Sequence, residues 1–192
     1  MSQPTYLKNL KAYARRQIGG TGESPILAIS NLLGESDRGA VILAATSIED
    51  LLEWAILARL PNLMLDHESR DSVFGPNGSL GTFSSKIAMA YAMAILDKAG
   101  RREIDLIREM RNACAHARLP ISFEEPALAD IARHMIPDMI PHMAHPIEAK
   151  WLRHAFVLKC TFLCQYIISG ERTDIAAELE AAATRQAEEL QP

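Results

Sequence analysis

The chain has 192 residues, and 48% of them are hydrophobic, which is enough to enclose one core without disulfides or metals. It carries 20 lysines and arginines against 24 acidic residues, and this balance excludes a protein that holds duplex DNA through an overall basic surface. Its three cysteines form no C-x-x-C pair, so a disulfide framework and a structural zinc site of that kind are excluded as well.

The chain also lacks the apolar segments that export or membrane insertion requires. Charges are scattered through the first 17 residues, and no apolar stretch there has signal-peptide length. The longest apolar run, 87–96, is far shorter than the roughly 20 residues that span a bilayer. We therefore expect a cytoplasmic protein without membrane contact.

Helical periodicity, helix caps and glycine or proline stops recur along the chain, whereas alternating β-branched stretches and fixed-period repeats are missing. These patterns predict an all-α fold, a single-domain bundle of about seven to nine helices over residues 1–192. In the first half the expected elements are helices at 4–18 and 25–34, a long core helix that begins after Ser36 and ends before Pro61, a short helical turn at 66–74, and an apolar helix at 82–99 that follows a 75–81 loop and stops at Gly100.

In the second half, a helix at 101–117 is expected to end before Pro120. Ser122 and Glu125 have the spacing of a capping box and predict a short helix after it. The remaining expected elements are an irregular connection rich in proline, histidine and methionine at 134–146, a long helix at 146–169, and an alanine-rich helix that begins at Thr173 and frays over 186–192.

The 101–117 helix holds the densest group of chemically useful side chains. Arg111, Asn112 and His116 supply a permanent cation, an amide and a group that titrates near neutrality, a set suited to a phosphodiester. Asn112 and His116 share a face, whereas Arg111 and His116 lie about 140° apart on an ideal helix. We expect them to converge only at a helix end, or across a symmetric dimer in which a second copy supplies the other wall.

A purely structural role is the alternative for this motif. Arg111 would then pair with a neighbouring carboxylate, and a protonated His116 would be favoured by the helix C-terminus. Arg108 and Arg118 on the same segment favour an edge that binds anions or RNA, although acidic residues between them partly cancel their charge. Both interpretations stay open on the sequence.

The stretch IREMRNACAH resembles the R-x4-6-H motif of the HEPN superfamily, small helical domains that dimerise and often act as metal-independent ribonucleases. Asn112 stands where that motif commonly has a polar residue after the arginine. The resemblance implies a homodimer in which His116 acts as general acid or base, Arg111 stabilises phosphate charge and Asn112 orients the substrate. It implies neither a metal nor a cofactor.

A longer stretch, 37–117, resembles the mannitol operon repressor family through DRGAVILAATSIEDLLEWAI, FGPNGSLGTFSSKIAMAYAMAIL and the motif helix. That family is named for transcriptional regulation, while its fold looks helical and lacks an evident helix-turn-helix. The resemblance therefore implies a regulatory interaction protein that works through protein partners, without sequence-specific DNA binding. The C-terminal helices expected over 118–192 match neither family.

Other groups of reactive side chains favour structural interpretations. The glycines of the 75–81 loop lack the lysine and the preceding strand of a phosphate-binding loop, so they indicate a turn before a helix. Cys160 and Cys164 lie on an apolar helix and indicate small core residues. The proline-rich connection holds four potential metal ligands but no regular ligand set, so we expect no metal site from His134, Asp138, His142 and His145.

Two functions follow from these patterns. The first is a mannitol-repressor-like helical regulator that acts through an unknown protein partner. The alternative is a toxin-like ribonuclease of the HEPN type, which needs Arg111, Asn112 and His116 in a dimer cleft and takes RNA as its ligand. Both expect a homodimer.

Overall fold

The computed structural model describes residues 31–136 and 149–170, and the structural statements below concern those two stretches. They contain seven α-helices, one 3-10 turn and no strand, which confirms the all-α prediction. The elements are η1 (Asn31–Gly34), α3 (Asp37–Leu57), α4 (Pro61–Leu65), α5 (His67–Phe74), α6 (Phe83–Ala92), α7 (Lys98–His116), α8 (Pro126–Met135) and α9 (Ala149–Ser169).

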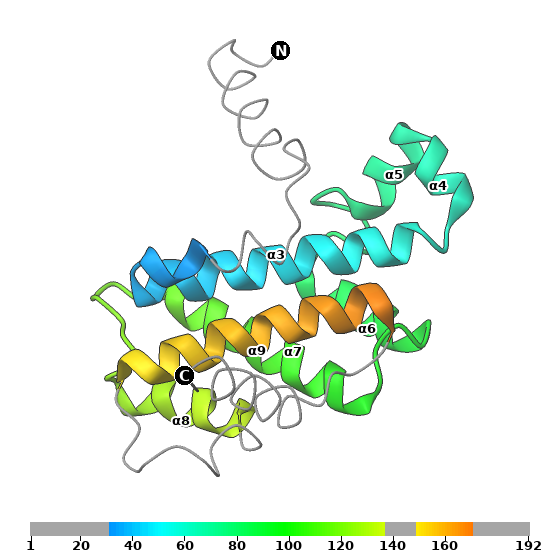
Figure 1. The fold of residues 1–192 in the computed structure, drawn as a ribbon. Coiled ribbons are helices and arrows are strands. Elements are labelled where there is room, and N and C mark those ends of the chain that lie inside the picture. Colours follow the sequence, from blue (N-terminus) through cyan, green and yellow to red (C-terminus); the bar gives the residue numbers. More distant parts are fainter. Residues whose placement is uncertain (1–30, 137–148, 171–192) are drawn as a thin grey trace, which may run out of the picture.

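The central helix of the bundle is α3, which contacts α9, α7, α6, α4 and η1. Its first turn lies beside the end of α7, since Arg38 Nη2 donates a hydrogen bond to the Ala115 carbonyl, 3.4 Å away. The same turn lies beside the start of α9, where Arg153 Nη1 is 3.3 Å from Asp37 Oδ1. Consequently α3 runs antiparallel to α7 and in the same direction as α9, and Figure 1 shows α3 and α9 stretched alongside each other.

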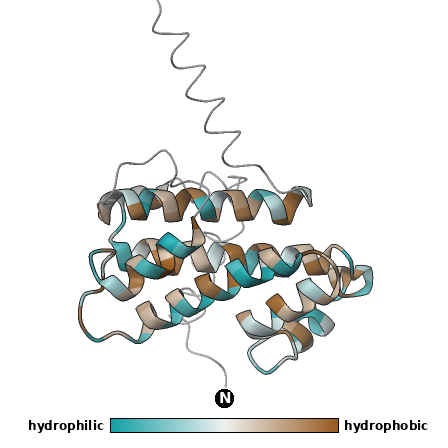
Figure 2. Cartoon of the chain, turned by 90° about the horizontal axis from the view of Figure 1, so that it is seen from below, coloured by the Kyte–Doolittle hydropathy of each residue, from teal (hydrophilic) through white to brown (hydrophobic). Residues whose placement is uncertain are grey.

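Burial of apolar side chains from all the long helices holds this bundle together. In Figure 2 hydrophilic and hydrophobic stretches alternate along the helices, as expected where each helix turns one side to the core. The aromatic rings of Phe123 and Phe156 meet at 5.6 Å between centroids and join the loop before α8 to α9. The other largest fully buried side chains are Ile48, Leu52, Ile56, Ile87, Leu96, Ile104, Ile107, Met110 and Ile136.

The long core helix starts where its cap predicts and ends earlier than Pro61 alone would require. Ser36 is the N-cap of α3, and its hydroxyl accepts a hydrogen bond from the Gly39 N–H at 3.1 Å. The helix ends at Leu57, and Pro61 instead opens the short helix α4, because its fixed φ and missing N–H suit a first helical turn. The expected helical turn that follows is α5, capped by the Asp66 carboxylate.

The prediction of one apolar helix stopped by Gly100 is wrong. Helix α6 ends at Ala92, and Ala94 takes a left-handed φ of 54°, so the chain turns before it reaches the glycine. The next helix, α7, begins at Lys98 because the Asp97 carboxylate accepts a hydrogen bond from the Gly100 N–H at 2.6 Å. Gly100 is therefore a buried residue inside the first turn of α7.

The predicted capping box before α8 does not form. The helix starts with Pro126 after Glu125, whose side chain makes no cap hydrogen bond, and Ser122 Oγ accepts from the Glu124 N–H instead. The expected helix at 4–18, most of the one at 25–34, the connection from 137 to 148 and everything after 170 lie outside the described residues. Within the described stretches, no helix is long and apolar enough to cross a membrane.

Candidate functional site

The predicted motif lies on the last two turns of α7, and the structure joins two of its three residues. Arg111 is partly buried, and its Nη1 donates to Asn112 Oδ1 at 3.3 Å. His116 is the last residue of the helix and its side chain is exposed. It makes no hydrogen bond or ion pair with any residue in the described stretches. A single copy of the chain therefore leaves His116 apart from Arg111.

Of the two structural roles expected for the motif, the placement of His116 in the last turn of α7 is found, whereas the carboxylate partner of Arg111 is not found among the described residues. Arg111 is bonded to an amide and not to a carboxylate. The helix C-terminus receives its cation from Arg38 of α3, whose guanidinium donates to the Ala115 carbonyl. His116 is exposed and makes no hydrogen bond or ion pair with the described residues, so its imidazole is accessible to a ligand.

Of the two arginines that were expected to form an anion-binding edge, one is engaged in ion pairs. Arg108 Nη2 lies 2.6 Å from Glu109 Oε1, and its Nε lies 3.5 Å from Asp105 Oδ1. Arg118 is exposed and makes no ion pair within residues 31–136 and 149–170. The edge near His116 therefore offers less free positive charge than the sequence suggests.

A second candidate site lies at the opposite end of α3, where α4 and α5 extend from the bundle (Figure 1). It is a pocket of about 320 Å³ between these three helices, a volume at the lower end of the range for ligand pockets. Its lining combines charged, aromatic and aliphatic side chains, namely Asp50, Glu53, Trp54, Leu57, Met64 and Arg70.

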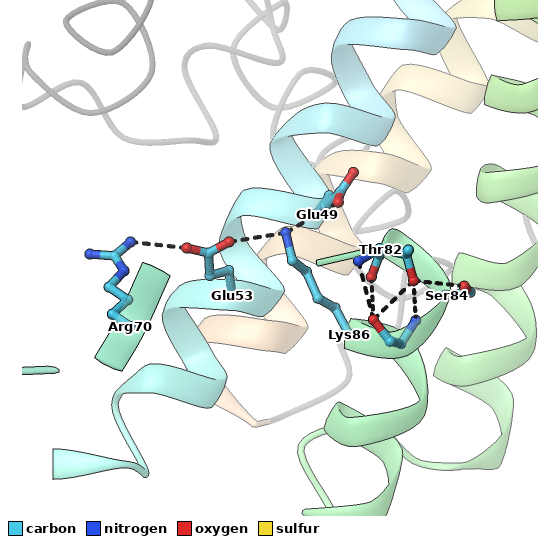
Figure 3. A network of polar contacts seen from close by, with 7 residues as sticks. Glu49, Glu53, Arg70, Thr82, Ser84 and Lys86 are labelled. Carbon is cyan, nitrogen blue, oxygen red and sulfur yellow. Dashed lines mark hydrogen bonds and ion pairs between the residues drawn. The ribbon is translucent and has the colours of Figure 1, made fainter. Parts of the chain in front are cut away.

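One wall of this pocket is held by an ion-pair network that joins three helices, shown in Figure 3. Lys86 of α6 is buried, and its Nζ lies 3.2 Å from Glu49 Oε1 and 3.0 Å from Glu53 Oε2. On the other side of Glu53, Arg70 Nη2 of α5 lies 2.9 Å from Oε1. Burial alone would lower the pKa of Lys86, but its contacts with Glu53 and Glu49 hold that pKa above its ordinary value.

Asp50 is the carboxylate that this network leaves out. It is partly buried and makes no hydrogen bond or ion pair with the described residues. Burial raises the pKa of Asp50 from 3.8 to about 6, against the opposing attraction of Lys86. At neutral pH the pocket therefore contains an ionised carboxylate that has no direct partner among the described residues.

The cysteines and the described histidine of the proline-rich segment offer no competing chemistry. Cys114, Cys160 and Cys164 are all buried, and burial raises the pKa of Cys164 to about 12, so the reactive thiolate is disfavoured. His134 is exposed on α8, whereas Asp138, His142 and His145 lie outside the described residues. Among the residues that are described, no three histidine, cysteine or acidic side chains gather as metal ligands.

The pocket did not emerge from the sequence analysis, although part of its signal was present. Glu49, Asp50 and Glu53 interrupt an otherwise apolar helix, and Trp54 follows Asp50 by one helical turn on the same face. Nothing in the sequence places Met64 and Arg70 against that face, because they lie on two separate short helices, α4 and α5, whose packing against α3 no local pattern predicts.

No family model, no curated protein and no solved structure matches this chain. The described residues thus hold two candidate sites, the α7 terminus and the pocket between α3, α4 and α5.

Proposed function

We propose that the chain is a helical regulatory protein, similar in kind to the mannitol operon repressor family, that acts through protein partners and not by direct DNA contact. The observation that carries this proposal is the apolar surface at the end of α3, next to the pocket. We call it the α4 surface and define it by Trp54, Met64 and Leu65.

The α4 surface exposes apolar side chains that a bundle of this kind would otherwise cover. Trp54 is 52% exposed, Met64 50% and Leu65 86%. Helix α4 has the sequence PNLML and contains no buried residue, so most of its apolar content is not used for folding. Exposed apolar surface beside a pocket is typical of protein interaction sites.

The charge distribution supports a protein partner over duplex DNA. The chain carries a net charge of -4, and DNA binding along the phosphate backbone requires clustered free cations. On α7, which has the most arginines of the described helices, Arg101 and Arg108 are within 4 Å of acidic side chains. The regulatory function is therefore best served by protein contacts.

Site-specific photo-crosslinking in cells tests this function. A photoreactive phenylalanine analogue is placed at Leu65 on the α4 surface, at Leu119 near the end of α7, and at Ile168 of α9 as an exposed control. We expect crosslinks to a different protein at Leu65 and not at Ile168, because the α4 surface combines exposed apolar side chains with a pocket. Adducts absent at Leu65, or equal at both positions, would contradict the proposal.

The ribonuclease is the second candidate, favoured by the accessible imidazole of His116 on the same helix as the bonded Arg111 and Asn112 pair. A general acid or base must reach its substrate, and an exposed, unbonded histidine satisfies that requirement. In this function Arg111 stabilises phosphate charge and Asn112 orients the substrate, with the second wall of the cleft supplied by another copy. Nuclease-sensitive adducts at Leu119 would favour this candidate.

A further inference from the structure

We propose that the pocket between α3, α4 and α5 binds an arginine or lysine side chain of the protein partner, and that apolar residues flanking that side chain cover Met64 and Leu65. This inference rests on the proposed function and names the chemistry of the partner segment that the α4 surface recognises.

The charges around the pocket do not balance. Glu49 and Glu53 are paired with Lys86, and Glu53 is paired with Arg70 as well. Among the described residues, three carboxylates thus meet two cations, and the one without an ion pair is Asp50, which lines the pocket. An incoming cation would complete the network, whereas an incoming anion would face a surplus of negative charge.

Trp54 adds an aromatic face one helical turn from this carboxylate. The two residues lie on the same side of α3, both line the pocket, and Trp54 is 52% exposed. An indole face beside a carboxylate attracts a cation through its quadrupole and through charge. Leu57 and Met64 complete the lining, and such aliphatic walls accept the methylene stem of arginine or lysine.

The surroundings of the pocket indicate a protein segment and not a free amine as the occupant. The pocket of about 320 Å³ accommodates a side chain or two, but Leu65 next to Met64 remains 86% exposed beyond that lining. A small amine would leave this apolar surface in water. On α5 and its cap, three exposed acidic side chains flank Arg70 and favour a basic approaching segment, namely Asp66, Glu68 and Asp71.

The protonation of Asp50 agrees with this assignment. Its pKa is raised to about 6 by burial, so ionisation at neutral pH carries a cost that a bound cation would offset. The charged groups that face it are Glu49 and Glu53 of its own helix, Lys86 of α6 and Arg70 of α5. An incoming cation therefore stabilises the ionised form of Asp50 more than that of Glu49 or Glu53, which already have ion-pair partners.

Fluorescence of Trp54 provides a direct test in the full-length protein. The chain has two tryptophans, so Trp151→Phe leaves Trp54 as the single reporter. The probe is a synthetic amphipathic peptide of about 15 residues with leucine and arginine on one face, and its twin has glutamine in place of arginine. We expect a saturable change with the arginine peptide and binding by the twin that is weaker by about tenfold or more.

Two charge-neutralising variants test whether Asp50 is responsible. Asp50→Asn should weaken binding of the arginine peptide about tenfold and leave binding of the glutamine peptide unchanged. Glu124→Gln removes the same charge from an exposed site near the start of α3, at the far end from the pocket, and should have no effect. Equal losses in both variants would show a general charge effect and overturn the inference.

The remaining outcomes separate this inference from the proposed function. If both peptides bind alike, or neither binds up to about 1 mM, the cation site is wrong. In that case, crosslinks from Leu65 to a different protein would still support the interaction function. Their absence would contradict both the cation site and the proposed function. A Trp54 signal that changes with protein concentration alone would assign the surface to a second copy of this chain and overturn the partner segment.

Discussion

Asp50 combines burial, an elevated pKa and the absence of a direct ion-pair partner in the described residues. Its folded-state pKa of about 6 lies above the ordinary value of 3.8, so the folded chain binds the proton more tightly than the unfolded chain. The cost of ionisation is fully present above pH 6 and disappears as the pH falls toward 4. Asp50→Asn should therefore raise the melting temperature at pH 7.5, with a gain that shrinks through pH 6 and vanishes near pH 4.

Thermal unfolding followed by circular dichroism across this pH range measures the effect. Glu124→Gln is the matched control, because its carboxylate is exposed, and its melting curve should follow that of the unaltered chain at every pH. A lower melting temperature for Asp50→Asn at pH 7.5 would mean that the carboxylate makes a stabilising contact, which conflicts with the pocket described here.

The motif on α7 makes a separate prediction for RNA. If the chain cleaves RNA, His116→Ala should reduce cleavage by about 10²- to 10⁴-fold, because proton transfer is lost while alanine preserves the helix. Arg111→Lys should also reduce it, since an ammonium cannot reproduce the planar guanidinium on a phosphate. Cleavage of single-stranded RNA with EDTA present measures this, and folding is checked by circular dichroism. An inactive unaltered protein would remove the ribonuclease candidate and leave the regulatory function.

The 75–81 loop between α5 and α6 is closed by backbone hydrogen bonds. The Gly78 N–H donates to the Gly75 carbonyl at 2.8 Å, and the Leu80 N–H donates to the Val73 carbonyl at 2.8 Å. A methyl group on Gly78 would overlap the backbone carbonyl of Val73, so the loop has no room for a side chain there. This close approach is the physical reason for glycine in the loop.

Gly78→Ala should accordingly destabilise the fold by about 2 kcal/mol or more, because backbone atoms must move to admit the methyl group. Gly34→Ala is the matched control, since nothing lies within 4 Å of the added methyl group. Urea unfolding of both variants gives the comparison. A loss no larger for Gly78→Ala than for Gly34→Ala would show that the loop relaxes freely.

The bundle exposes apolar side chains near both ends of α3. We predict that a second copy of the chain binds at the end near α7 and a partner protein at the α4 surface. We predict that the chain forms a homodimer, for which light scattering should report twice 21.2 kDa. We place the dimer contact near the end of α7, where Leu119 is 77% exposed next to His116, because the ribonuclease cleft requires a second copy there.

Leu119→Glu should therefore convert the dimer to a monomer, whereas Leu65→Glu should leave the mass unchanged and abolish partner adducts. Arg38, which contacts the end of α7, and Trp54 of the α4 surface are 16 residues apart along α3 (54 − 38), a rise of about 24 Å, so one substitution should not disturb the other site. A monomer at micromolar concentration would remove both the dimer and the shared cleft. A monomer produced by Leu65→Glu alone would place the dimer on the α4 surface.

The sequence alone predicted the elements whose limits are encoded by neighbouring residues. Ser36 caps α3 through its own hydroxyl, and the all-helical class follows from caps and periodicity that extend over a few turns. At Gly100 the local pattern gave the wrong prediction. A glycine after an apolar run indicates the end of a helix, but Asp97 caps the start of α7 and Gly100 is buried inside its first turn.

Only the tertiary structure decided which side chains meet. Arg38 reaches the Ala115 carbonyl across 77 positions, and Lys86 reaches Glu49 across 37, so no local pattern identifies either pair. Asp50 has no ion-pair partner among the described residues because Lys86 and Arg70 pair with Glu49 and Glu53, the two carboxylates near it on α3. The sequence by itself determined the helices and the charge of each residue, while packing of α4, α5 and α6 against α3 determined which charge remains available to a partner.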